Sequence, residues 1–331
     1  MSAKPLSITS INLLKILTDG KVHSGAALGN KLTITRAAVW KLIKQLQSYG
    51  VEIISLQSSG YILQEEIKLL SRAAIVENLV SQDIACDYKF KIFSSIPSTN
   101  QYLLDFPLAC DNDKVICLSE SQTSGRGRFG RSWHSPFAKN IYFSQLWSLS
   151  QDISVLNGLG IAVCVAVVNA LTSYGIRDIG IKWPNDILYQ GEKLAGILIE
   201  LRAEANGALR VVIGVGINVN LYKEVADINQ PWTSLRKITN TSHDRNIIVG
   251  RLISEFDSAL KLFLDQGSQA FLDVWEKHDY LKGKAITLHI ANDKQAKGIV
   301  SGIDARGWLG LADASGKVSY YSAGDTSISP R

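Results

Sequence analysis

Three apolar segments joined by very short connections constrain the fold of this chain more than any other feature. They are residues 181–189 (IKWPNDILY), 193–201 (KLAGILIEL) and 209–220 (LRVVIGVGINVN). Each has the length and β-branched content of a strand, and the links contain the turn sequences QGE and ANG. Because such short links join antiparallel neighbours, the segments predict a run of hairpins. GVGIN (214–218) lies inside the last strand with no helix after it, so we reject a dinucleotide-binding fingerprint there.

Other strands and helices are mixed around this run. Further strands are expected at 88–93, 114–120 and 140–147. Further helices are expected at 96–106, where Ser98 or Thr99 is the cap, and at 153–174, 246–265 and 268–278. Residues 283–328 alternate between short strand-like segments and turn sequences, as in a small β-barrel. The predicted fold class is α+β, with helices to one side of a central mixed or antiparallel sheet.

The first 65 residues form a small module of their own. Residues 9–19, a segment after Ser24 and a segment after Thr35 have the periodicity of short helices. VEIISL (51–56) and GYIL (60–63) then flank a tight turn and predict a hairpin. Three short helices followed by a hairpin make a winged helix-turn-helix arrangement, whose third helix fits the major groove of DNA.

The third helix of this module is basic on its outer face. Residues 1–65 carry seven Lys and Arg against three acidic residues, a net charge of +4, whereas the whole chain carries +5. Because Lys and Arg attract phosphate independently of base sequence, we expect DNA binding. A protein-docking or dimerisation module is the alternative, since charged helix faces are usually just solvated. The expected DNA contacts are Arg36, Ala37, Trp40, Lys41 and Lys44.

Composition and cysteine spacing exclude several classes of protein. The chain is 46% hydrophobic and 20% charged, as in a globular protein rather than a disordered one. Its most apolar run, residues 158–171, is shorter than the ~18 residues of a membrane span, and the N-terminal residues lack the charged-then-apolar pattern of a signal peptide. Cys86, Cys110, Cys117 and Cys164 show no metal or disulfide spacing. We therefore expect a cytoplasmic protein with reduced thiols and no membrane contact.

The segment GRGRFGRSW (125–133) places three arginines among three glycines between two predicted strands. A disordered Arg-Gly tail would be long, repetitive and terminal, which this segment is not. Glycine permits unusual backbone angles, and guanidinium groups bind carboxylate and phosphate oxygens in a fork. The segment therefore predicts a loop that closes over a phosphorylated or carboxylated small molecule.

Two shorter motifs are ambiguous by themselves. In KWPND (182–186), Pro184 must break or edge the strand, and Asn185 and Asp186 follow it. Asp186 could hold Mg²⁺ or accept a proton, but Asn-Asp after Pro is also simple turn chemistry. In KLAG (193–196), Lys193 begins a strand and the small Gly196 allows a ligand close approach, although a lysine there is more often a solvated charge.

Together these motifs resemble one family over essentially the whole chain. STNQ (98–101), GRGRFGRSW, KWPND, KLAG and GVGIN occur in the order and spacing of biotin–protein ligases. The winged helix and the final barrel are similar to the bacterial bifunctional form, a biotin ligase that also represses the biotin operon. The resemblance implies a biotin/lipoate ligase-like central sheet and a small SH3-like barrel at the C-terminus. It also implies four parts: a DNA-binding domain (1–65), a linker with a connecting helix (66–82), a catalytic domain (83–280) and the barrel (281–331).

The resemblance further implies an activity and its residues. Such an enzyme joins biotin to Mg²⁺-bound ATP and then passes biotin to a lysine of a carboxyl carrier domain of acetyl-CoA carboxylase, with no bound prosthetic group. The catalytic residues would be Lys193, Arg126, Arg128 and Asp186, the last also the possible Mg²⁺ ligand. Biotin would contact Ser98, Thr99, Asn100, Gln122, Gly125, Arg126, Arg128, Lys193 and Gly196. ATP or the adenylate would contact Arg128, Arg131, Trp133, Asn185, Asn218 and Trp232.

The two halves of the chain suggest a switch. If biotinyl-5′-AMP promotes a homodimer, the small molecule would raise affinity for a two-fold symmetric operator. Two alternatives stay open: a biotin sensor that has lost catalysis, and a related lipoate or octanoate ligase. Phe129 and Ser132 stand where many relatives have more basic residues, and the wing tip SSGY (58–61) lacks a lysine that some relatives carry. The first departure lowers the positive charge of the loop, and the second bears on DNA affinity and on the preference for an operator.

Overall fold

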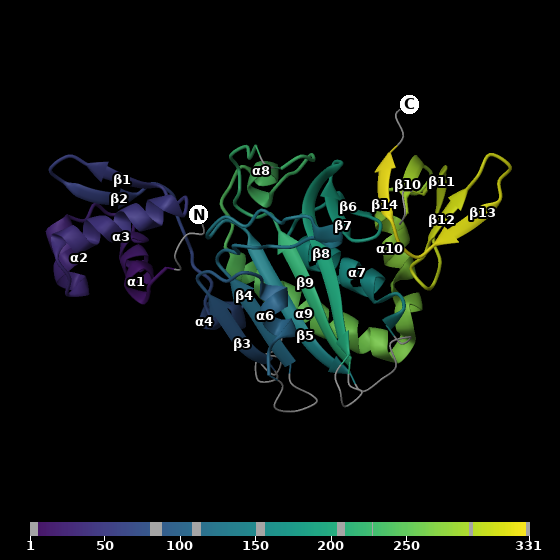
Figure 1. Cartoon of the computed structure of the whole chain (residues 1–331), viewed down its shortest axis with the longest axis horizontal. Coiled ribbons are helices and arrows are strands. Elements are labelled where there is room, and N and C mark those ends of the chain that lie inside the picture. The colour runs from purple at the N-terminus through teal and green to yellow at the C-terminus, as the bar shows by residue number, and fades with distance from the viewer. Residues whose placement is uncertain are drawn as a thin grey trace.

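Three parts follow one another along the long axis of the molecule (Figure 1). The N-terminal module lies at one end, a seven-stranded sheet with its helices lies in the middle, and a five-stranded sheet lies at the other end. The structure is a computed structural model. It describes residues 6–79, 88–107, 114–149, 156–203, 209–226, 228–290 and 294–328.

The N-terminal module is the predicted winged helix-turn-helix. Its elements are α1 (Ile8–Leu17), α2 (Gly25–Leu32), α3 (Arg36–Ser48), β1 (Ile53–Leu56) and β2 (Gly60–Leu63). Ser7, Ser24 and Thr35 cap the three helices, each accepting a hydrogen bond from the backbone N–H three residues later. The apolar stripe of α3 faces inward, since Val39, Ile43 and Leu46 are buried. The predicted helices and hairpin are therefore confirmed.

The central sheet is mixed. Its order is β3-β4-β5-β9-β8-β7-β6, in which β3 and β4 are parallel and every other neighbouring pair is antiparallel. One strand prediction was wrong: residues 181–189 form a hairpin, because Pro184 lies in a turn and Lys182 pairs back with Asp186. The strands are β3 (Tyr88–Phe93), β4 (Lys114–Ser119), β5 (Ile141–Leu149), β6 (Ile179–Lys182), β7 (Asp186–Tyr189), β8 (Glu192–Ala203) and β9 (Leu209–Ile217).

Helices cover both faces of this sheet, which corrects the expectation that they lie on one side. Alternate residues of β4 show the two faces. Ile116 and Leu118 belong to the large core with α7 and α9, whereas Val115 and Cys117 pack with Leu103 of α6. The helices of this part are α4 (Arg72–Val76), α6 (Thr99–Leu104), α7 (Leu159–Ser173), α8 (Leu235–Thr239), α9 (Arg245–Gln266) and α10 (Leu272–His278).

Two helix predictions need adjustment at their starts. The expected helix at 153–174 begins at Leu159, and residues 153–155 lie outside the described part. The expected helix at 268–278 begins as a 3₁₀-helix, η3 (Gly267–Phe271), and continues as α10. The end of the predicted linker, residues 80–82, also lies outside the described part.

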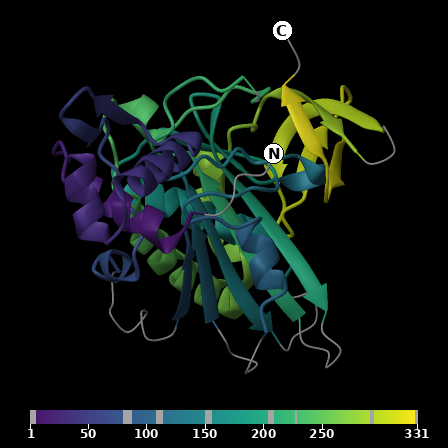
Figure 2. The same ribbon diagram turned by 60° about the vertical axis from the view of Figure 1, so that its left-hand side comes forward.

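The C-terminal sheet, drawn in yellow-green to yellow in Figure 2, is antiparallel. Its strand order is β13-β12-β11-β10-β14. Its strands are β10 (Ala285–His289), β11 (Gln295–Ile303), β12 (Leu309–Ala312), β13 (Val318–Tyr321) and β14 (Asp325–Ile328). The short strands expected at 283–328 are confirmed, and closure into an SH3-like barrel stays a prediction. Its apolar residues Ile286, Leu288 and Leu309 join the large core of the central part.

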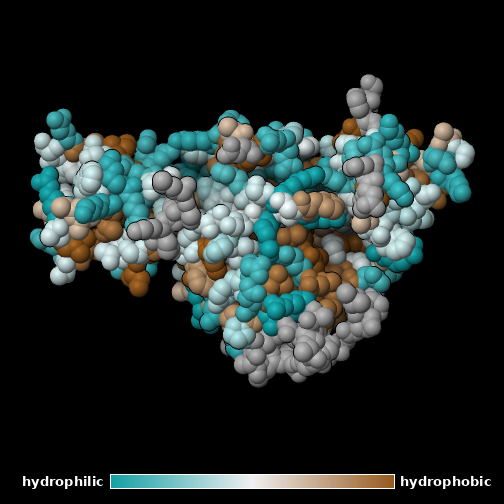
Figure 3. All heavy atoms as spheres, viewed as in Figure 1, coloured by the Kyte–Doolittle hydropathy of each residue, from teal (hydrophilic) through white to brown (hydrophobic). Residues whose placement is uncertain are grey.

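The surface and the thiols fit a globular chain. Figure 3 shows hydrophobic residues gathered on the visible face of the central part, while the two ends are mostly hydrophilic on that face.

Two of the four cysteines lie in the described part of the chain. Cys117 and Cys164 are free and buried, and burial raises the pKa of both thiols. Cys86 and Cys110 lie outside the described residues. Within the described part of the chain, no helix is long and apolar enough to cross a bilayer.

Candidate ligand-binding site

The site has a floor made of glycines on the central sheet. The register places Tyr142 of β5, Gly216 of β9, Gly196 of β8 and Asp186 of β7 in one row across four strands. With no Cβ at the two central positions, the sheet leaves room for a flat group. Trp133 occupies part of that room: a Cβ on Gly216 would lie 2.4 Å from its indole, and one on Gly196 would lie 3.0 Å away. The glycines of GVGIN therefore serve close approach to the sheet.

A polar wall stands at one side of this floor, at the start of α6. The Ser98 hydroxyl caps the helix, so of the two predicted caps Ser98 is the one used. The Gln122 side chain accepts from both the N–H and the hydroxyl of Thr99, at 2.9 and 3.1 Å. Asn100 is buried, and it fits against the sheet because Gly214 has no side chain. These groups present several hydrogen-bonding atoms to one small hollow.

The segment 125–133 forms the opposite cover. Its two ends lie side by side. The backbone N–H of Trp133 donates to the Gly125 carbonyl, and the backbones of Arg126 and Ser132 form an antiparallel β-bridge. Phe129, at its tip, has a left-handed backbone with φ of 56° and is 68% exposed. The loop thus projects from the sheet as a hairpin-like flap that places Trp133 over the floor. Among the described residues, Nε1 of Trp133 has no hydrogen-bond partner although the atom is buried.

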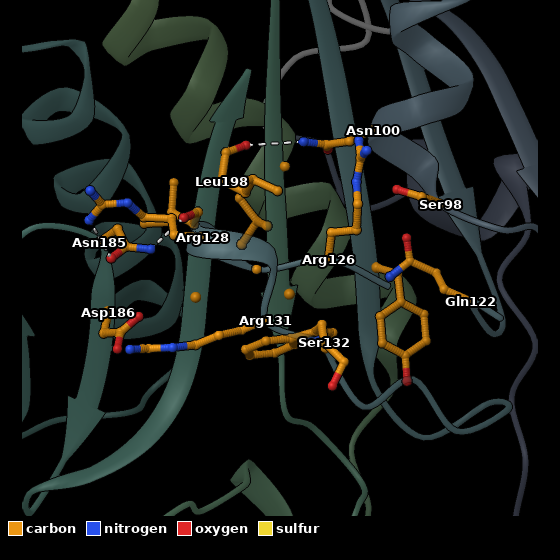
Figure 4. Close-up of a pocket in the computed structure, with 18 of the residues that line it drawn as sticks. Ser98, Asn100, Gln122, Arg126, Arg128, Arg131, Ser132, Asn185, Asp186 and Leu198 are labelled. Carbon is orange, nitrogen blue, oxygen red and sulfur yellow. Dashed lines mark hydrogen bonds between the residues drawn. The ribbon is translucent and has the colours of Figure 1, made fainter. Parts of the chain in front are cut away.

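Four cationic side chains surround the hollow, and each has a polar partner. Arg126 pairs with Glu200 at 3.0 Å, and Lys193 pairs with Asp186 at 2.7 Å. Arg128 donates to Asn185 at 3.4 Å, and Arg131 pairs with Asp325. Figure 4 shows Arg128 and Asn185 pointing toward each other on one side, with Arg126 and Asn100 on the other. The arrangement places four cations around one hollow, which the polar wall, the loop and the strands β7 and β8 line together.

The ionisation of two groups follows from this crowding. Burial lowers the pKa of Arg128, while the carboxylates of Asp325 and Asp186 oppose that shift. Burial raises the pKa of Asp325, but the hydrogen bond and charge of Arg131 and the charge of Lys182 bring it below its ordinary value. The lowered pKa keeps Asp325 ionised at neutral pH, and a guanidinium group remains protonated there even where burial lowers its pKa.

Most of the residues predicted for the site line this hollow. They are Ser98, Thr99, Asn100, Gln122, Arg126, Arg128, Arg131, Trp133, Asn185, Asp186, Lys193 and Gly196. Three predicted residues lie beside it instead. Gly125 lets the chain pass close to Trp133 and Ser135, and Asn218 donates to the Lys193 carbonyl. Trp232 is only 6% exposed, with the Lys237 ammonium 3.7 Å from its ring centroid, so its stacking role stays a prediction.

Sequence reasoning missed two acidic partners of the arginines. Glu200 lies on β8 and Asp325 begins β14, far along the chain from the loop that they contact. An acidic residue inside an apolar strand was the available signal for Glu200. Asp325 had no such signal, because its strand belongs to the C-terminal sheet.

The predicted DNA-contacting residues share one exposed surface on α3. Arg36, Ala37, Lys41 and Lys44 are exposed, and Trp40 is 52% exposed. The Lys44 ammonium lies 6.0 Å from the centroid of the Trp40 ring. An aromatic ring and three cations on a helix whose opposite stripe is buried make a surface suited to a polyanion.

Comparison with known proteins decides the family. A model of the biotin/lipoate A/B protein ligase family matches residues 92–218, and a model of an HTH domain matches residues 9–62. The bifunctional ligase/repressor BirA of Salmonella typhimurium is 37% identical over 319 residues, which cover 96% of this chain and 97% of that protein. The chain belongs to the BirA family of bifunctional ligase/repressors.

Other members and relatives of the BirA family agree with this assignment. BirA of Escherichia coli is 36% identical over 319 residues, covering 96% of each chain. A biotin protein ligase from Aquifex aeolicus, solved in complex with biotin and ATP, superposes with a TM-score of 0.62 at 24% identity over 73% of this chain and 99% of that one. The latter likeness shows a shared fold. The resemblance drawn from the sequence motifs is thus confirmed at the level of the family and the fold.

Proposed function

We propose that this member of the BirA family is an ATP-dependent biotin–protein ligase. It joins biotin to ATP to give biotinyl-5′-AMP and pyrophosphate, and then transfers biotin to a lysine of the biotin carboxyl carrier domain of acetyl-CoA carboxylase. The observation that carries the proposal is the ring of Arg126, Arg128 and Lys193 around the glycine floor in a chain that matches bifunctional ligase/repressors over 96% of its length.

The first step is an attack of the biotin carboxylate oxygen on the α-phosphorus of ATP. The bond from that phosphorus to the β-phosphate oxygen breaks, and pyrophosphate leaves. Both reactants are anions, so the step needs preorganised positive charge where they meet. Arg126, Arg128 and Lys193 are the groups proposed for this role, and their fixed partners reduce the reorganisation that the step requires.

The binding roles proposed for the remaining residues follow their positions. Ser98, Thr99, Asn100 and Gln122 would bind the biotin head through the polar wall, and Gly196 would let the ligand reach the sheet. Nε1 of Trp133 has no partner among the described residues and fits a donor to a ligand oxygen. Arg131 and Asn185 would serve the ATP side, with Asn218 and Trp232 as outer contacts. The mixed anhydride product is sensitive to water, which a loop closing over it would exclude.

Magnesium would arrive as part of the Mg²⁺–ATP substrate. The described residues contain no cluster of three His, Cys, Asp or Glu side chains that could hold a metal. Mg²⁺ commonly uses one or two carboxylates together with substrate phosphates, and Asp186 supplies a carboxylate at the hollow. Asp186 is therefore the proposed protein contact of the substrate metal.

In the second step the amine of the carrier lysine attacks the acyl carbon of the adenylate. An amide bond forms, the bond from the acyl carbon to the phosphate oxygen breaks, AMP leaves, and the nitrogen loses one proton to the solvent. Asn185 and Asp186, at the turn beside the hollow, are the groups proposed to face the incoming lysine.

We also propose that the chain represses transcription of the biotin operon. Biotinyl-5′-AMP would promote a homodimer, and two copies of α3 would then bind a two-fold symmetric operator through Arg36, Ala37, Trp40, Lys41 and Lys44. A cytoplasmic location and the three domain boundaries at 65, 82 and 280 are also part of this proposal.

The deciding experiment incubates the protein with biotin, Mg²⁺ and α-labelled ATP. A biotin-dependent labelled adenylate is expected. Biotin binding without adenylate would instead support a sensor that has lost catalysis, and preferential adenylation of lipoate or octanoate would support the related acyl ligase. For the repressor half, we expect DNA binding that rises with the adenylate and a dimer seen by analytical ultracentrifugation under the same conditions.

A further inference from the structure

Glu200 lies on β8, four residues after Gly196 of the floor. Its carboxylate accepts hydrogen bonds from the loop 125–133 and from α6. Nη2 of Arg126 donates to both carboxylate oxygens, at 3.0 and 3.1 Å. Nδ2 of Asn100 donates to Oε2 at 2.8 Å. Glu200 thus connects the loop 125–133 to the N-terminal turn of α6.

The contact continues through a chain of buried hydrogen bonds. The Ser144 hydroxyl lies 2.5 Å from Oδ1 of Asn100 and 2.7 Å from the Thr99 hydroxyl. Thr99 in turn donates to Gln122. A single polar network therefore runs from Arg126 through Glu200 to the side chains proposed to bind biotin. Glu200 is its link to Arg126, while Gln122 reaches the other end of the loop through the Ser135 hydroxyl, which donates to the Trp133 carbonyl.

The Arg126 side chain needs such an anchor because it is long. The backbone bridge between Arg126 and Ser132 holds the chain at this point, but it does not fix the side-chain torsions that decide where the guanidinium points. A charge-assisted bond to a carboxylate fixes both the position and the plane of the group. Only Nη2 of Arg126 is engaged among the described residues, which leaves Nε and Nη1 to face an anionic ligand.

We propose that Glu200 is a positioning residue for adenylate formation, an inference that rests on the proposed ligase function. It holds Arg126 and Asn100 at a fixed separation, so that the arginine presents its free edge to the biotin carboxylate while the loop covers the hollow. Glu200 acts through Arg126 and does not itself touch substrate. Its loss should affect the chemical step more than the binding of biotin.

The test compares Glu200→Gln, Glu200→Asp and a matched control. Glutamine keeps the size of the side chain but removes its charge and turns an NH₂ group toward donors. Aspartate keeps the charge and shortens the reach. Asp105→Asn is the control, because Asp105 forms an exposed 3.2 Å pair with Arg202 on the same strand, away from the hollow. Biotin affinity, single-turnover adenylation and the lifetime of the bound adenylate are measured for each full-length variant.

Glu200→Gln should slow adenylation by roughly 10- to 100-fold, the size of effect that a misplaced catalytic group produces, with a smaller change in biotin Kd. It should also shorten the lifetime of the bound adenylate, whereas Glu200→Asp should recover part of the rate and Asp105→Asn should match wild type. Wild-type rates in Glu200→Gln would overturn the proposal. So would parallel losses of binding, rate and thermal stability, which indicate a structural role only. Failure of wild type to form adenylate would refute the ligase function itself, before any variant is compared.

Discussion

The ring of Phe137 packs edge-on against the ring of Tyr49, with centroids 5.9 Å apart and planes at 76°. Tyr49 is the C-cap of α3, the helix proposed to enter the DNA groove, and Phe137 follows Trp133 of the loop 125–133 by four residues. Phe137 and Ala138 are both buried in the core of the N-terminal module. An ion pair between Glu65, which follows β2, and Lys139, which follows Ala138, joins the same two parts of the chain. The N-terminal module and the ligand-binding part therefore share a hydrophobic core.

Phe137→Ala should weaken this shared core. Removing a buried phenylalanine ring typically costs about 3–5 kcal/mol, and we expect the N-terminal module to unfold separately from the rest. Urea unfolding followed by circular dichroism measures both effects. Phe129→Ala is the control, because Phe129 is 68% exposed and should leave the unfolding free energy unchanged. A single transition with wild-type stability in Phe137→Ala would contradict the shared core.

Gly216→Ala should obstruct the glycine floor. The new methyl group would lie 2.4 Å from Trp133, so the indole must move into the space that the ligand needs. We expect biotin affinity to fall by roughly 10-fold or more, as expected for the 1–3 kcal/mol that overpacking costs. Gly160→Ala in α7 is the matched control, because its new methyl group meets nothing within 4 Å. Titration calorimetry checks both, and equal affinities would show that Trp133 adjusts without penalty.

Lys193→Ala should disable adenylation. The substitution removes a cation from the reaction site and leaves the carboxylate of Asp186, its 2.7 Å partner, without that charge. A loss of about 100- to 1,000-fold in the adenylation rate is expected for one electrostatic group of this kind. Lys282→Ala, which breaks an exposed pair with Glu276, should have no effect. Pyrophosphate exchange measures the rate, and an unchanged rate would remove Lys193 from the proposed machinery.

Replacing both Lys41 and Lys44 by alanine should weaken DNA binding and flatten its dependence on salt. Each phosphate contact that is lost reduces the slope of log affinity against log salt by about 1. Lys297→Ala with Lys317→Ala removes the same charge from the C-terminal sheet and serves as the control. Binding is measured by fluorescence anisotropy across salt concentrations. Identical slopes in wild type and the Lys41/Lys44 variant would favour a protein-docking module.

The Arg131–Asp325 pair should make stability depend on pH in acid. Although burial opposes it, Arg131 brings the pKa of Asp325 below its ordinary 3.8. A carboxyl with a lowered folded-state pKa stabilises the fold above its unfolded pKa, and this contribution is lost as the pH falls through the folded value. From about pH 5 downward, wild type should lose more unfolding free energy than Asp325→Asn. Urea titrations at several pH values test this, and Arg131→Ala, which keeps the carboxyl but removes the cation, should also lose less unfolding free energy than wild type over this range. Parallel pH profiles for wild type and Asp325→Asn would argue against the pair.

Much of the N-terminal module and the nature of the loop were predictable from the sequence. Helix caps such as Ser24 and Thr35 bond to backbone three residues away, so they act within a window that a sequence pattern covers. The apolar stripe of α3 likewise depends only on helical spacing. The arginines and glycines of 125–133 predicted a loop beside a small-molecule site through residue chemistry alone; the structure places Arg126, Arg128 and Arg131 at one hollow, and anion binding by the loop stays a prediction.

Only the tertiary structure decided how the site is assembled. Gly196 and Gly216 form one floor because β8 and β9 pair in a register that places them opposite each other. If one of these strands slipped by one residue, its glycine would no longer face the hollow. Glu200 reaches Arg126 across 74 residues of sequence, and Asp325 reaches Arg131 across 194. Local propensity carries no information about such pairs, because they depend on strand register and on the packing of distant elements. The sequence by itself thus determined which chemical groups are present and the short elements that carry them, while long-range packing determined which groups meet.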